Sequence, residues 1–324
     1  MRTSKDLILA TKVFTQENRF KSWMETYTTL FLLVLFFIGT FITFSFLIKI
    51  LCSFLLGLLY VRMFVIYHDY QHHAILQKSN WAKILMKTFG ILILVPQTIW
   101  KRSHDHHHNH NSKLTITGIG SYPTISKERF LNLSTNDQKI YLLNRHWLTV
   151  ILGYFTLFIY WLNVKSFIQS PRRHLDSLAS LLIHFVVGGL IWYYLGFGSF
   201  LISWFVPYFL AFAIGSYLFY CQHNFPGAIF KENQDWRYDH AALESTSFMV
   251  MPQFMHWMTG NIGYHHVHHL NSRIPFYRLP EAMKQMPELH GVYRTSWNPI
   301  EMWRCFRLKL WDPDKGKMIT LKQI

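Results

Sequence analysis

Residues 28–73 read TTLFLLVLFFIGTFITFSFLIKILCSFLLGLLYVRMFVIYHDYQHH, a long apolar stretch with few charges. Residues 28–48 are 21 residues without a charge, enough for a helix to cross a bilayer. After Lys49, residues 50–67 add 18 more, with Arg62 as their only charge. Together the two runs are too long for one span. We therefore predict a tight helical hairpin, with the Arg62 side chain extending to the membrane interface.

The composition supports a membrane protein. Of 324 residues, 51% are hydrophobic and only 15% are charged, whereas soluble domains carry about 25% charged residues. The apolar content excludes a disordered chain, and three cysteines are too few for a disulfide framework or a zinc–thiolate site. The net charge of +15 comes without any nucleic-acid-binding motif. We therefore expect basic faces against anionic lipid, and no nucleic-acid partner.

Four further apolar runs follow the first hairpin. Residues 89–100 are too few to cross the membrane and include Pro96, so this run is predicted to lie on or dip into it. Residues 177–195 and 199–220 are separated by three residues without a charge and predict a second hairpin. Residues 147–164 are bracketed by basic residues and are predicted to lie in the interface.

The distribution of lysine and arginine predicts the orientation. Nearly all of them lie outside the two hairpins, which places the hairpin tips outside and their ends in the cytoplasm. We predict an all-α, multi-pass integral membrane protein with about four transmembrane helices in two hairpins, plus interfacial helices and a cytoplasmic helical cap. The single domain would contain an amphipathic lead-in (1–26), the first hairpin (28–67), a cytoplasmic and interfacial region (68–176), the second hairpin (177–220) and a second cytoplasmic region (221–324).

Histidines are concentrated in three short windows: HDYQHH (68–73), HDHHHNH (104–110) and HHVHH (265–269). Residues three or four apart share one face of a helix, so each window offers part of a metal coordination shell. Three such helix ends can hold two metal ions, although imidazole alone does not identify the metal. The soluble carboxylate-bridged di-iron bundles use Glu-x-x-His pairs, and this chain has none. We therefore expect a site rich in nitrogen ligands, held by the cap.

The three windows resemble the histidine boxes HxxxH, HxxHH and HxxHH of the membrane fatty acid desaturase family. The context of the third, GNIGYHHVHHLNSRIPFYRL (260–279), is similar to that of acyl-lipid desaturases acting at the Δ12 (ω-6) position. The segment YCQHNF (220–225) resembles a Gln-His pair that ends the last span in that family. The resemblance implies an oxidoreductase that uses O₂ to introduce a cis double bond into a fatty acyl lipid or acyl thioester.

The resemblance also implies the cofactor, its ligands and a partner. The cofactor would be two non-haem iron ions, and electrons would come from a separate carrier, a ferredoxin or a small cytochrome. The implied ligands are His68, His72, His104, His107, His108, His223, His265, His268 and His269. His73 is a secondary candidate, and a shifted pairing of His106 with His110 stays open. Asp69 and Asp105 each follow a box-opening histidine, and either orient it or have no metal role.

Histidine spacing leaves the reaction open. A related di-iron lipid hydroxylase or carotenoid ketolase is an alternative, because the same ligands serve oxygen insertion. A metal transporter or sensor with cytoplasmic histidine loops is the non-enzyme alternative. Transporters need polar ligands at mid-membrane, and the predicted spans offer only His184 and a few hydroxyl groups. The abundant aromatic residues are candidates for the lining of an acyl tunnel.

Overall fold

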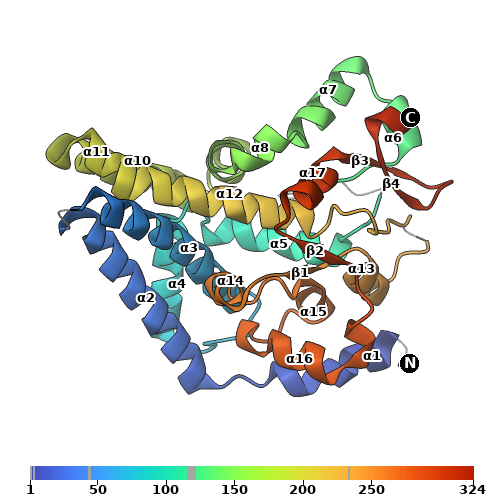
Figure 1. Ribbon diagram of the computed structural model, residues 1–324, viewed down its shortest axis with the longest axis horizontal. Helices are drawn as coiled ribbons and strands as arrows, with labels where there is room; N and C mark the ends of the chain where they lie inside the picture. The colour runs from blue at the N-terminus through green and yellow to red at the C-terminus, as the bar shows by residue number, and fades with distance from the viewer. Residues whose placement is uncertain (1, 3, 43–44, 115–121, 233) are drawn as a thin grey trace.

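The computed structural model describes residues 2, 4–42, 45–114, 122–232 and 234–324. Most of these residues are helical (Figure 1). Four helical stretches are long and apolar enough to span a membrane: α2 (Arg19–Ile42), α3 (Phe46–Gln71), α10 (Leu175–Leu195), and Phe197–Cys221, which joins α11 (Phe197–Phe200), the π-helical η3 (Leu201–Phe205) and α12 (Val206–Cys221). The prediction of an all-α membrane protein with about four spans is therefore confirmed.

The first hairpin is formed by α2 and α3, which pack against each other along their length (Figure 1). The chain turns between Ile42 and Phe46, where residues 43–44 lie outside the described residues. The prediction of a turn at Lys49 was wrong, because Lys49 lies in the first turn of α3. A lysine near a helix end can extend its side chain to the interface, so its charge does not mark where the helix stops.

The prediction that the Arg62 side chain extends to the membrane interface was wrong. The side chain is buried inside the protein, with only 2% of its surface exposed. It donates hydrogen bonds to the Glu25 carboxylate, to the Trp257 carbonyl and to the Thr29 hydroxyl, the last at 3.0 Å. Its guanidinium carbon lies 3.8 Å from the centre of the Trp257 ring. This one side chain therefore links α2 and α3 to α14 (Gln253–Met258).

Replacing Arg62 by Met is expected to destabilise the protein by about 3–5 kcal/mol, because it leaves the Glu25 carboxylate largely buried without its partner. Thermal unfolding in detergent measures this loss. The double variant Glu25→Gln/Arg62→Met removes both charges and should recover most of the stability. An Arg62→Met protein as stable as the wild type would show that the ion pair is not a source of stability.

A sharp bend lies in the run that was predicted to dip into the membrane. α4 (Asn80–Leu92) and α5 (Gln97–His110) meet there at 90°. Side chains from four other segments donate hydrogen bonds to backbone carbonyls around the bend: Ser180 to Ile91 (2.5 Å), Tyr208 to Leu92 (3.0 Å), Asn163 to Leu94 (2.8 Å) and Tyr67 to Val95 (2.9 Å). Non-helical backbone at membrane depth is tolerated only where such groups are satisfied by protein or water. These contacts stabilise the bend from which α5 starts.

The segment between the two hairpins folds as short helices. α6 (Lys127–Leu131) and α7 (Thr135–Asn144) precede α8 (Trp147–Ile151), the π-helical η2 (Tyr154–Lys165) and α9 (Ser166–Gln169). α8 and η2 pack against α12, and η2 also packs against α10. This segment is not among the candidate spans, which agrees with the prediction that residues 147–164 do not cross the membrane.

The C-terminal part wraps around one short helix, α15 (His265–Leu270), near the centre of the molecule (Figure 1). Its other helical elements are α13 (Tyr238–Glu244), α14, η4 (Phe276–Arg278), α16 (Leu279–Gln285), η5 (Pro287–Leu289), α17 (Pro299–Arg307) and η6 (Leu321–Gln323). Strand β1 (Phe248–Val250) pairs in parallel with β2 (Arg294–Ser296), and β3 (Leu308–Asp312) pairs antiparallel with β4 (Lys317–Thr320). The N-terminal α1 (Ser4–Ala10) and η1 (Thr11–Thr15) pack against α13 and α16.

Candidate metal centre

Histidines from four segments meet at the ends of α3, α5, α12 and α15. Each of two groups can hold a metal ion: His68, His72, His104, His108 and His268 in the first, and His107, His223, His265 and His269 in the second. Within each group the candidate ligand atoms all lie within 4.8 Å of one another. All nine side chains are buried except that of His223, which is half-buried. Together the two groups contain the nine histidines that the family resemblance implies as ligands.

Helix geometry explains why one window serves both groups. His104 and His108 are four residues apart on α5 and share the face toward the first group, while His107 lies toward the second. α15 divides in the same way, since His268 belongs to the first group and His265 with His269 to the second. The rings of His108 and His269 stack with their centroids 4.2 Å apart, so the two groups are in direct contact.

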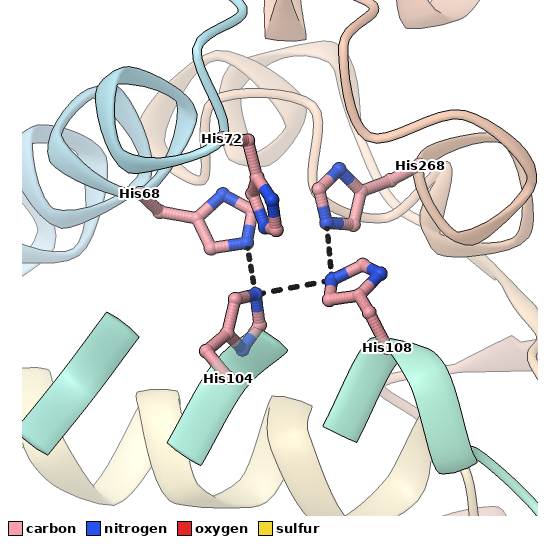
Figure 2. A group of neighbouring side chains, drawn as sticks. All are labelled: His68, His72, His104, His108 and His268. Atoms are coloured by element: carbon pink, nitrogen blue, oxygen red, sulfur yellow. Dashed lines mark hydrogen bonds between the residues drawn. The ribbon is translucent and has the colours of Figure 1, made fainter. Parts of the chain in front are cut away.

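Figure 2 shows the first group, whose rings point from three segments toward a common centre. The Nε2 atom of His104 lies 2.8 Å from that of His68 and 3.1 Å from that of His108. A further 3.1 Å separates the Nε2 atoms of His108 and His268. In the second group the Nε2 atom of His223 lies 3.0 Å from that of His107 and 2.9 Å from that of His265.

These separations fit a bound metal ion. Imidazole nitrogens bind transition metals at about 2.0–2.1 Å, so two ligands at right angles lie roughly 3 Å apart. The buried Nε2 atom of His72 has no hydrogen-bond partner among the described residues, nor do the Nδ1 atoms of His104, His108 and His268. A cation at the centre would use the Nε2 lone pairs that otherwise face one another. The donor set therefore fits one metal ion in each group.

The histidines of the third window are held in the form that binds metal. Burial, with repulsion between neighbouring imidazoles, lowers the pKa of His265, His268 and His269 well below the usual 6.5. Burial lowers the pKa of His223 to about 4. Burial disfavours the charged form of an imidazole. These rings are consequently neutral at pH 7, with a lone pair free for a metal ion.

Two contacts orient ligand rings from behind. Asp69 Oδ1 lies 3.2 Å from Nδ1 of His68, while Oδ2 accepts a hydrogen bond from the backbone N–H of Phe276 at 2.6 Å. Of the two alternatives that the sequence left open for Asp69, this contact supports the orienting role. His223 Nδ1 lies 3.1 Å from the Ser245 carbonyl, its hydrogen-bond acceptor. Both contacts leave Nε2 of the ring directed into its group.

For Asp105 the structure supports the other alternative, that the carboxylate has no role at the metal site. Its carboxylate is half-exposed and pairs with Lys101 at 2.9 Å. The Lys101 ammonium group, one turn earlier on α5, holds this carboxylate at the surface of the helix.

Replacing Asp69 by Asn is expected to reduce metal affinity or activity by about 10–100-fold, the usual effect of losing a carboxylate behind a ligating histidine. Asp105→Asn is the matched control, since it makes the same change beside the opening histidine of the second window. Iron content and turnover of both purified variants measure the difference. Equal losses in the two, or no loss in Asp69→Asn, would contradict the orienting role of Asp69.

Other histidines lie outside both groups. His73, the secondary candidate, is exposed and hydrogen-bonds Gln77 at 2.7 Å. The rings of His106 and His110 stack on each other with their centroids 4.3 Å apart, and neither residue belongs to the two groups. His266 is buried against Phe248. We therefore leave these four residues out of the proposed ligand set.

Three aromatic residues beside the ligands were not recognised in the sequence. Each lies four residues before a histidine of the groups: Phe64 before His68, Trp100 before His104 and Phe219 before His223. Trp100 stacks on His104 with centroids 4.8 Å apart, and the Phe219 ring lies 5.1 Å from that of His107. Residues four apart share a helix face. The repeated pattern aromatic-x-x-x-His was therefore a usable signal.

The same three aromatic residues line an apolar cavity. Its walls come from α3, η2, α12 and the bend before α5, and carry no charged side chain: Tyr60, Val61, Phe64, Ile93, Trp100, Leu157, Phe158, Leu162, Ala211, Phe212, Gly215 and Phe219. Because Trp100 contacts His104 and Phe219 contacts His107, these two rings lie between the cavity and the two groups of histidines.

Comparison with known proteins gives one consistent result. The model of the family "Fatty acid desaturase" matches residues 44–300. A "Fatty acid desaturase" of Bacillus subtilis is 30% identical over 267 residues, covering 81% of this chain and 74% of the relative. An "sn-1 oleoyl-lipid 12-desaturase" of Anabaena variabilis is 26% identical, covering 89% of this chain and 83% of that protein. A chloroplastic "Omega-6 fatty acid desaturase" of Spinacia oleracea is also 26% identical, but the match covers only 54% of its length.

Proposed function

Because this chain belongs to the fatty acid desaturase family, we propose that it introduces a cis double bond into an acyl chain of a membrane lipid, with O₂ as oxidant and two iron ions as cofactors. The observation that carries this proposal is the apolar cavity whose aromatic lining residues Trp100 and Phe219 contact histidines of the two groups. The names of the oleoyl-lipid and omega-6 relatives support an acyl lipid as the substrate.

The nine histidines would hold the two iron ions, five around one and four around the other. Imidazole also suits zinc, copper and nickel, so the choice of iron rests on the family. A pair of iron ions bound there would activate O₂ to remove one hydrogen from each of two neighbouring methylenes. With two electrons and two protons from outside, one O₂ becomes two water molecules. Asp69 and the Ser245 carbonyl keep the rings of His68 and His223 directed inward.

The cavity would bind the acyl chain. Its uncharged lining suits a row of methylene groups. An apolar chain gains free energy when it leaves water, or when it exchanges loosely packed contacts for close contacts with apolar side chains. The rings of Trp100 and Phe219 would then contact both the chain and the ligand rings of His104 and His107. This arrangement would hold one pair of methylenes beside the metal centre and exclude water from it.

The electrons would come from a separate carrier, a ferredoxin or a small cytochrome, on the cytoplasmic side of the membrane. The net charge of +15 supports this proposal, because a basic face attracts an acidic carrier. The concentration of lysine and arginine outside the hairpins supports the cytoplasmic side.

Expression in a host that makes only saturated and monounsaturated lipids tests the proposal. The host must also contain a competent electron donor. A desaturase lowers the mass of an acyl chain by two hydrogen atoms, whereas a hydroxylase adds one oxygen atom. Fragmentation of the products would then locate the new double bond. Lipids unchanged in mass would contradict the proposed function. Oxygenated products would also contradict it and would support the hydroxylase alternative.

A further inference from the structure

A second pocket lies beside the acyl cavity. It is formed by the first turns of α5, the end of η2, α9 and the segment that leads into α10. Three of its lining residues are permanently basic side chains: Arg102, Lys165 and Arg173. We call this the basic pocket.

The charge of the basic pocket is not neutralised by the protein. Among the described residues, none that lines it is acidic. In the part of the chain that the structure describes, none of the three cations forms an ion pair with a carboxylate. The nearby Asp176 instead accepts hydrogen bonds from the backbone N–H and the hydroxyl of Thr98, at 3.1 and 2.6 Å, at the start of α5. The three positive charges therefore remain available to an anion.

The basic pocket lies where a lipid headgroup would be. Arg173 comes two residues before Leu175, where the candidate span α10 begins. Lys165 Nζ lies 3.4 Å from the centre of the Trp161 ring, and Trp161 is 40% exposed. Tryptophan with lysine or arginine at the end of a span is typical of the membrane interface. Basic pockets between membrane helices bind anionic lipid headgroups.

The basic pocket also adjoins the acyl cavity. The buried Leu162 lines both of them. On α5 the neighbouring residues Ile99 and Trp100 line the basic pocket and the acyl cavity respectively. Leu162 therefore forms part of the wall between the two spaces, and a lipid with its headgroup among the three cations has the acyl cavity directly on the other side of that wall.

We propose that Arg102, Lys165 and Arg173 bind the phosphate of an anionic phospholipid whose acyl chain occupies the acyl cavity. The assignment of this lipid as substrate rests on the proposed function. The binding of its phosphodiester group rests on the basic pocket alone. The basic pocket thus selects lipids that carry a net negative charge.

Native mass spectrometry of the purified protein with added phosphatidylglycerol tests this assignment. The triple variant Arg102→Gln/Lys165→Gln/Arg173→Gln is expected to bind phosphatidylglycerol about 100-fold more weakly than the wild type. The matched control is Lys83→Gln/Lys87→Gln/Lys139→Gln, which removes three exposed lysines without ion pairs among the described residues. The control should bind as the wild type does, and both proteins should keep their iron.

Three results would overturn the proposal. One is equal phosphatidylglycerol binding by the triple variant and the wild type. Another is an equal loss in the control, which would indicate unspecific surface charge. The third is displacement of the lipid by inorganic phosphate alone, which would make this a phosphate site rather than a lipid site. Lipid binding is measured without turnover. A wild-type protein that binds phosphatidylglycerol but never desaturates a lipid would contradict the proposed function and not the lipid site.

Discussion

Replacing His268 by Ala is expected to reduce desaturation by about 1000-fold or more, because a metal ion supplies several kcal/mol of transition-state stabilisation that is lost with its ligand set. His268 Nε2 lies 3.1 Å from Nε2 of His108, and its ring centroid lies 4.5 Å from that of His68. Its loss therefore opens the first group on one side. The measurement is turnover together with iron per chain, which should fall from two toward one.

His73→Ala is the control for this experiment. It also removes an imidazole ring, next to the proposed ligand His72, but at an exposed position outside both groups. Its activity and iron content should equal those of the wild type. Full activity with two iron ions in His268→Ala would remove His268 from the ligand set. Inactivity in both variants would show that histidine loss acts through something other than the two groups.

Replacing Gly215 by Leu is expected to reduce turnover by about 100-fold, the effect of displacing a reacting group by roughly an ångström. Gly215 lines the acyl cavity, and a Cβ built there meets only Phe158, at 4.0 Å. The larger side chain thus fits the fold while occupying the space proposed for the acyl chain. The variant should fold and keep its iron, so that turnover falls while metal content does not.

The matched control is Gly189→Leu on α10. Gly189 is exposed, and a Cβ there has no heavy atom within 4 Å among the described residues. Both changes place leucine in a membrane helix, but only Gly215→Leu fills the acyl cavity. Turnover in Gly215→Leu equal to that in Gly189→Leu would mean that the acyl chain binds elsewhere.

The membrane helices and the histidine windows were predictable because their signals are local. A run of about 20 uncharged residues predicts a span without knowledge of its neighbours. The spacing of three and four residues predicts which side chains share a helix face. These two rules account for the four candidate spans and for the shared direction of His104 with His108.

The remaining features depend on contacts between distant segments. His108 meets His268 across 160 positions of sequence, and Arg62 bonds the carbonyl of a residue 195 positions later. No local pattern says that five histidines gather in one group and four in the other, or that Arg62 has partners inside the protein. The aromatic residue four positions before a ligand was visible in the sequence, but the cavity that it lines required α3, α5, η2 and α12 to be placed together.

Anomalous diffraction at the iron absorption edge, from crystals of protein loaded with Fe²⁺, tests the central claim most directly. We predict two peaks, one surrounded by His68, His72, His104, His108 and His268, and the other by His107, His223, His265 and His269. A single peak, or a peak bound by residues outside these nine, would contradict the account.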